Sequence, residues 1–135
     1  MTTSRALLKR VGLPTQRAEA VATLAAALAG DRIDLSPGAE WGRARRDLAA
    51  IPGIGARTLE IIAMRALGDP DAFPATDLGV RRALDKLALS PARSERWRPW
   101  RSYATQYLWA QLPHPMNHLP TDPATTRDEP RRTPR

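Results

Sequence analysis

The sequence predicts an all-α fold, and three observations support that prediction. Apolar residues recur every three or four positions in each patterned segment, which is the spacing of a helix face. No segment alternates apolar and polar residues, and no hairpin turn joins β-branched runs. Glycine and proline separate the helical segments from one another. We expect one helical domain over residues 1–112, a size that suits a single modest core.

The first predicted helix begins after Gly12-Leu13-Pro14 and ends at Gly30, which supplies a C-terminal stop. Its apolar positions follow one helix face and are Ala18, Val21, Leu24, Ala25 and Leu28. A second, shorter helix is expected from Gly42 to Ala50. There Leu48 points inward and the arginine-rich face lies in water.

The segment Ile51-Pro52-Gly53-Ile54-Gly55 then interrupts the helical pattern, because glycine and proline disfavour a helix interior. Helical spacing resumes near Arg57 and stops at Gly68-Asp69-Pro70. The core candidates of this helix are Leu59, Ile62, Ala63 and Leu67. The pattern therefore predicts two helices joined by a tight, glycine-rich hairpin.

The last third of the domain is also predicted to be helical. A loop over 71–76 leads to a helix near Asp77 to Leu87. Ser90-Pro91 has the form of an N-cap followed by proline at the first helical position. A final helix is expected from Trp97 or Pro99 to Ala110, and its aromatic residues are Trp100, Tyr103, Tyr107 and Trp109.

Residues 113–135 differ in composition from the rest of the chain. They contain six prolines, many charged residues and few large apolar ones. Such a segment cannot bury enough apolar surface to offset the entropy lost on ordering. We therefore expect a disordered, Pro/Arg-rich C-terminal tail.

The chain is strongly basic, with a formal net charge of +7, and only two of its 21 basic residues are lysines. One interpretation is a genome-wide preference for arginine. The other is an electropositive surface that attracts a polyanion. Charge alone does not decide between DNA, RNA and a membrane surface.

Several kinds of chemistry are excluded by composition. The absence of cysteine rules out disulfides, thiol catalysis and Cys-ligated metals. The two histidines, His114 and His118, lie in the expected tail, which argues against a His-based metal site. The chain shows no secretory signal pattern and no apolar run of transmembrane length. We expect a cytoplasmic protein with no membrane association, no metal and no cofactor.

The hairpin has the features of a phosphate-binding turn. Gly53 and Gly55 allow close approach of a ligand to the backbone, and Ile51 and Ile54 can anchor the turn in the core. Free amides at the start of the next helix would then face a backbone phosphate. An ordinary glycine-rich turn is the alternative. The candidate DNA contacts are Gly53, Ile54, Gly55, Arg57 and Thr58.

The hairpin, followed by Phe73-Pro74-Ala75-Thr76-Asp77, resembles the signature of helix-hairpin-helix DNA glycosylases. Within that superfamily, Trp97-Arg98-Pro99-Trp100-Arg101-Ser102-Tyr103-Ala104 and Trp109 resemble the bacterial DNA-3-methyladenine glycosylase II branch. The resemblance covers about residues 12–110. It implies release of alkylated purines, such as 3-methyladenine and 7-methylguanine, from double-stranded DNA by a monomeric enzyme.

By this resemblance Asp77 is the catalytic carboxylate, which would stabilise positive charge on the deoxyribose. A simple N-cap is its alternative role. Arg57 occupies the place where strand-nicking relatives carry a nucleophilic lysine, so we expect a monofunctional enzyme. Arg57, Ile61 and Trp109 match positions that line the base pocket, where relatives often carry aromatic residues at the first two. Trp109 could instead be a core residue, as we expect for Trp97, Trp100 and Tyr103.

The resemblance also implies helices before residue 12 that this sequence lacks. We expect the chain to correspond to the C-terminal part of a longer, N-terminally truncated enzyme, which an upstream fragment or domain could complete. The alternative function is a non-catalytic helix-hairpin-helix DNA-binding module, or an inactive remnant of a glycosylase.

Overall fold

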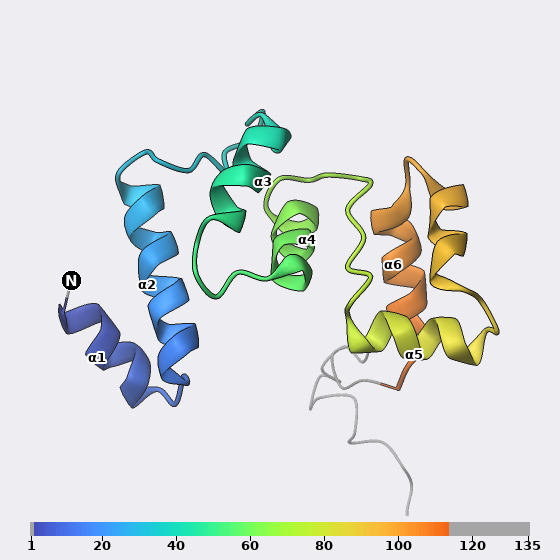
Figure 1. Ribbon diagram of the computed structural model, residues 1–135, viewed down its shortest axis with the longest axis horizontal. Helices are drawn as coiled ribbons and strands as arrows, with labels where there is room; N and C mark the ends of the chain where they lie inside the picture. Colours follow the sequence, from blue (N-terminus) through green and yellow to red (C-terminus); the bar gives the residue numbers. More distant parts are fainter. Residues whose placement is uncertain (1, 114–135) are drawn as a thin grey trace, which may run out of the picture.

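The computed structural model describes residues 2–113, with side chains from residue 6 onward, and every regular element in them is helical (Figure 1). This confirms the predicted all-α class. The expected tail lies outside the described residues except for Pro113. The elements are α1 (Thr2–Arg10), α2 (Thr15–Ala29), α3 (Trp41–Ala49), α4 (Ala56–Arg65), α5 (Leu78–Lys86), the 3-10 helix η1 (Pro91–Trp97) and α6 (Arg101–Ala110).

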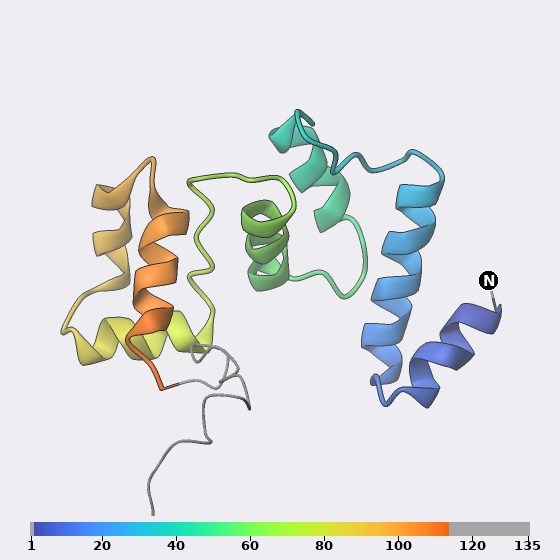
Figure 2. The same ribbon diagram turned by 180° about the vertical axis from the view of Figure 1, so that it is seen from behind.

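Helices that are neighbours in sequence pack together. The pairs α1–α2 and α3–α4 and the group α5–η1–α6 follow one another along the long axis of the molecule (Figures 1 and 2). A loop over 66–77 connects the middle pair to the last group. No described helix has the length and apolar character needed to span a lipid bilayer.

Two apolar clusters on either side of that loop matter for the site. The first gathers Ala27 of α2, Ile33, Leu48 of α3 and Ile51 of the hairpin. The second gathers Phe73 of the loop, Val80, Ala83 and Leu84 of α5, and Leu108 of α6. Leu48, Val80 and Leu84 are almost completely buried, so each cluster removes substantial apolar surface from water.

The element boundaries mostly follow the predicted signals. Ser90 caps η1 by accepting a hydrogen bond from the amide of Ala92, as its N-cap pattern predicted. Helix α1 was not predicted. The last helix begins at Arg101, later than expected, because residues up to Trp97 form η1 and Pro99 follows.

The expectation that Trp100 and Tyr103 pack in the core is wrong. Their exposed fractions are 58% and 59%, and the two rings meet edge to face at the surface, with centroids 5.8 Å apart. Trp97 does pack inward, with its ring edge to face against Phe73. The buried residues of α6 are Ser102, Thr105 and Leu108, so the N-cap residue Trp100 and Tyr103 lie off the buried face of this helix.

Candidate active site

Asp77 ends the loop between α4 and α5 and is the N-cap residue of α5. Its side chain accepts a hydrogen bond from the amide of Val80 at 3.0 Å, which satisfies one of the free donors of the first helical turn. The N-cap role that we weighed as the alternative is therefore confirmed. Capping does not account for the rest of the environment, because the side chain is only 7% exposed and has further partners.

Two other helices donate to the same carboxylate. Arg57 Nε of α4 donates to Asp77 Oδ1 at 2.5 Å, and Trp109 Nε1 of α6 donates to Oδ2 at 2.9 Å. Burial alone raises the pKa of Asp77, but its side-chain and amide donors outweigh burial and hold the pKa below the ordinary value of 3.8. The carboxylate is consequently ionised at neutral pH and held by donors from three helices.

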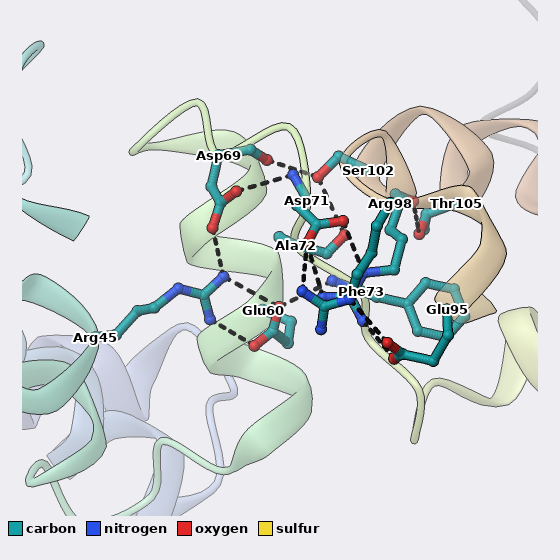
Figure 3. Close-up of polar contacts among 11 residues, drawn as sticks. Arg45, Glu60, Asp69, Asp71, Ala72, Phe73, Glu95, Arg98, Ser102 and Thr105 are labelled. Carbon is teal, nitrogen blue, oxygen red and sulfur yellow. Dashed lines mark hydrogen bonds and ion pairs between the residues drawn. The ribbon is translucent and has the colours of Figure 1, made fainter. Parts of the chain in front are cut away.

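The loop that carries Asp77 is held by ionic contacts with α3 and α4 (Figure 3). Arg45 of α3 donates to Glu60 Oε1 at 2.5 Å and to Asp69 Oδ2 at 2.7 Å. Glu60 also accepts the amide of Phe73 at 2.9 Å. Asp69 therefore ties the start of the loop to α3, and Glu60 ties the loop backbone at Phe73 to α4. The path of the loop is set before it reaches α5.

A second ionic cluster holds the same loop from η1 and α6 (Figure 3). Arg101 Nε and Nη2 donate to the two oxygens of Asp71 at 2.8 Å and 3.0 Å, and Arg98 adds a third bond at 3.0 Å. Glu95 of η1 accepts from both arginines. The hydrogen bond from Arg101 is the main cause that holds the pKa of Asp71 below its ordinary value.

The hairpin between α3 and α4 is anchored as predicted. Ile51 is buried, and Ile54 packs against the same apolar cluster. Gly53 has a φ of 92°, in the left-handed region that favours glycine. The amides of Gly53 and Gly55 have no hydrogen-bond partner among residues 2–113, and both residues are exposed. The turn therefore presents free donors to solvent.

The structure brings three of the predicted site residues into direct contact: Asp77, Arg57 and Trp109. Ile61 lies one turn after Arg57 on α4 and is half-buried. Thr58 is exposed in the first turn of α4. The hairpin residues Gly53, Ile54 and Gly55 precede that turn and make no polar contact with Asp77.

Two residues that the sequence reasoning missed also reach this site. A Cβ on Gly79 would lie 3.0 Å from Asp77 Oδ2 and 3.3 Å from Trp109 Cδ1. The Arg65 guanidinium lies over the indole of Trp109, 5.9 Å from its centroid. One signal was available in the sequence, because residues 57, 61 and 65 follow at intervals of four on one helix face.

Two hollows of the described residues lie away from Asp77. One, of about 540 Å³, lies between residues 31–40 and α3, and the other, of about 270 Å³, lies between α6 and residues 87–97. Neither is lined by Asp77 or by any other predicted site residue.

Within residues 2–113 no group of three or more acidic residues or histidines is placed to hold a metal ion. The reactive group that the described contacts fix in place is the ionised carboxylate of Asp77.

A hairpin with free amides between two helices, followed by a loop-borne buried carboxylate, is the arrangement that the sequence motifs of a helix-hairpin-helix DNA glycosylase led us to expect. No protein-family profile matches the chain. Over the matched residues it is similar to bacterial proteins that are named DNA-3-methyladenine glycosylase or AlkA.

The relatives are bacterial proteins. The chain is 52% identical over 116 residues to a "Probable bifunctional transcriptional activator/DNA repair enzyme AlkA" of Mycobacterium tuberculosis, a match that covers 82% of this chain and 23% of the relative. It is 37% identical over 105 residues to "DNA-3-methyladenine glycosylase 2" of Escherichia coli, which covers 76% of this chain and 37% of that protein. A "DNA-3-methyladenine glycosylase" of Bacillus subtilis is 37% identical over 78 residues, 51% of this chain and 26% of the relative. The chain therefore spans between about a quarter and two fifths of the length of these relatives.

Proposed function

We propose that this chain carries the catalytic aspartate of a monofunctional DNA glycosylase, which hydrolyses the N-glycosidic bond of alkylated purines in duplex DNA during base-excision repair. The single observation that carries the proposal is the state of Asp77. It is buried, its pKa is held below 3.8, and it follows the hairpin at the place that matches the catalytic aspartate of the family. The lesions we propose are of the 3-methyladenine and 7-methylguanine type, in keeping with the names of the relatives.

Asp77 would act on the sugar of the damaged nucleotide. Cleavage of the glycosidic bond develops positive charge on the deoxyribose, and an ionised carboxylate with fixed orientation lowers the energy of that state. The carboxylate can also orient the attacking water. The base must first be extruded from the duplex, because the reacting bond is not accessible inside the base stack. We propose that Arg57, Ile61 and Trp109 line the site that receives it.

The proposed contacts to the DNA backbone are on the hairpin and the first turn of α4. The amides of Gly53 and Gly55 have no hydrogen-bond partner among residues 2–113, and Arg57 and Thr58 are exposed in the first turn of α4. Such donors bind phosphate without reading sequence. Ile54 anchors the turn because its side chain packs against the apolar cluster that contains Leu48 and Ile51. The charge of +7 favours a polyanionic partner.

The reaction would end at an intact abasic site. Arg57 stands where strand-nicking relatives use a lysine, and arginine stays protonated, so it cannot form a Schiff base with the sugar. We further propose that the unit over residues 1–112 acts as a monomer in the cytoplasm, and that residues 113–135 form a separate tail. An upstream segment would add further contacts to the base site beyond these three residues, since the relatives are much longer than the matched region.

The test is release of methylated purines from duplex DNA by the purified chain, beside Asp77→Asn. The variant keeps the size of the side chain and an acceptor for the Val80 amide, but it loses the negative charge. We expect release by the wild type and a loss of at least about a hundredfold in the variant. Chromatography of the freed bases measures the reaction, and gel analysis should show an unbroken strand until the abasic site is treated with alkali.

A control must show that both proteins are folded and bind DNA. Affinity for an undamaged duplex should fall steeply as salt rises, to a similar extent for the wild type and Asp77→Asn. A folded chain that binds duplex DNA with this salt dependence but frees no base would contradict the catalytic proposal and leave a DNA-binding module.

A further inference from the structure

Trp109 approaches the carboxylate with its edge. Its Nε1 donates to Asp77 Oδ2 at 2.9 Å, and that oxygen also accepts the amide of Val80. The indole can come this close because the residue between them in space has no side chain. A Cβ on Gly79 would lie 3.0 Å from Oδ2, 3.3 Å from Cδ1 and 3.4 Å from Nε1 of the indole.

Arg65 acts on the same indole from α4. Its guanidinium carbon lies over the ring, 5.9 Å from the centroid, a distance at which a cation is attracted to the ring face. The Arg65 guanidinium thus contacts the face of the Trp109 indole, and Gly79 leaves room for the pyrrole edge of the ring. Both contacts favour the orientation in which the N–H bond points at Asp77.

We propose that Trp109 serves in this chain as the hydrogen-bond donor that orients the Asp77 carboxylate, with Gly79 and Arg65 as positioning residues that hold the indole in place. The catalytic meaning of this role rests on the function proposed above. It differs from a stacking role for Trp109, in which the open face of the ring would support the extruded base. In the described arrangement the edge is engaged with the carboxylate and a guanidinium lies over the face.

Trp109→Phe separates the two roles, because phenylalanine keeps an aromatic face for stacking and loses the N–H donor. The orienting role predicts that the pKa of Asp77 rises in this variant and that kcat/KM for release of methylated purines falls on the order of tenfold to a hundredfold. Carbon-13 NMR titration of the labelled carboxyl measures the pKa. Trp97→Phe is the matched control, since Trp97 packs against Phe73 and makes no contact with Asp77.

Gly79→Ala tests the positioning role without substituting Asp77 or Trp109. The added methyl forces the indole and the carboxylate apart by a few tenths of an ångström, while alanine itself favours a helix more than glycine does. We expect the Trp109 indole N–H resonance, assigned from its loss in Trp109→Phe, to shift toward a more weakly bonded position. The pKa of Asp77 should rise in Gly79→Ala and should not rise further when Gly79→Ala is added to Trp109→Phe.

The proposal is overturned if Trp109→Phe leaves the Asp77 titration unchanged, or if Gly79→Ala leaves both the indole resonance and the titration unchanged. Should Gly79→Ala fail to fold, Arg65→Gln replaces it, and the same indole resonance is expected to shift. These readouts do not need turnover. A chain that releases no base but shows the expected shifts contradicts the proposed function alone, whereas an active chain with unchanged shifts contradicts the orienting role alone.

Discussion

The Asp77 carboxylate is buried, but its ion-pair partner Arg57 is exposed to solvent. The Arg57 side chain is 57% exposed, whereas that of Asp77 is 7% exposed. Arg57 can therefore exchange the carboxylate for a phosphate without unpacking the protein, but Asp77 cannot move to follow it. Its ion pair neutralises part of the charge on which catalysis would depend, so Arg57 is the residue through which DNA contacts could alter the site.

Arg57→Gln should change the behaviour of the chain in acid. The folded-state pKa of Asp77 lies below 3.8, so its contribution to stability is present above that value and is lost as pH falls through the folded pKa. The variant loses the ion pair, its Asp77 pKa rises, and the loss of stability on acidification should become smaller. Urea unfolding between about pH 2 and pH 6 measures this.

Arg82→Gln removes an exposed arginine of α5 and serves as the control for net charge. It should keep the acid sensitivity of the wild type. Equal acid sensitivity in both variants would show that the Arg57 pair does not stabilise the ionised carboxylate.

At the level of the elements, the hairpin depends on close packing against α2. Gly53 has a φ of 92°, and a Cβ there would lie 2.9 Å from the Cβ of Ala20. Gly55 has an ordinary φ of −87° and open space around it. Of these two glycines, only Gly53 is therefore required by the local structure to lack a side chain.

Gly53→Ala should destabilise the fold by about 1–3 kcal/mol, because it adds backbone strain and a clash with α2. Gly55→Ala is the matched variant, and we expect it to change the free energy of unfolding by less than about 1 kcal/mol. Urea denaturation of both proteins compares them. Equal losses of stability would mean that the approach of α2 to the hairpin is not a constraint.

The elements with local signals were predictable, and those that depend on distant packing were not. Periodicity and caps located α2, α3, α4 and α5 to within a few residues. Helix α1 has few apolar residues and its tertiary support comes from α2, so its own sequence gave little indication of it. The aromatic run from residue 97 onward reads as one helix, and the break between η1 and α6 was missed.

The site was predictable in its parts and not in its contacts. The motif identified Asp77, and the resemblance placed Arg57 and Trp109 near it. Their bonds to Asp77 span 20 and 32 residues of sequence, and no local pattern specifies such pairings. The contribution of Gly79 was hidden for the same reason, since its constraint comes from a residue on another helix.

At the level of the whole molecule, the loop between α4 and α5 connects two packed groups of helices. Arg45 contributes most directly to that connection, because it is largely buried between Glu60 and Asp69. By contrast, Arg43 on the same helix pairs with Asp47 at 3.7 Å while 73% of its side chain is exposed. Such exposed pairs contribute little to stability.

Arg45→Met should lower the free energy of unfolding by about 1–3 kcal/mol, because two carboxylates would lose their shared cation. Arg43→Met makes the same exchange on the same helix and should have little effect. Thermal and urea unfolding of both variants decide the point. A loss in Arg43→Met as large as that in Arg45→Met would place the effect in α3 itself rather than in the loop contacts.

The long-range contacts of the loop also set an order of assembly during synthesis. The hairpin and its two helices use partners close in sequence, so they can form as soon as they leave the ribosome. The carboxylate cannot be completed then, because Arg101, Ser102 and Trp109, which hold the loop and Asp77, all belong to the last described helix. A nascent chain that ends before residue 100 would carry a formed hairpin and an Asp77 that lacks its donor from α6. On the function proposed above, affinity for DNA would thus precede the capacity for chemistry each time the protein is made.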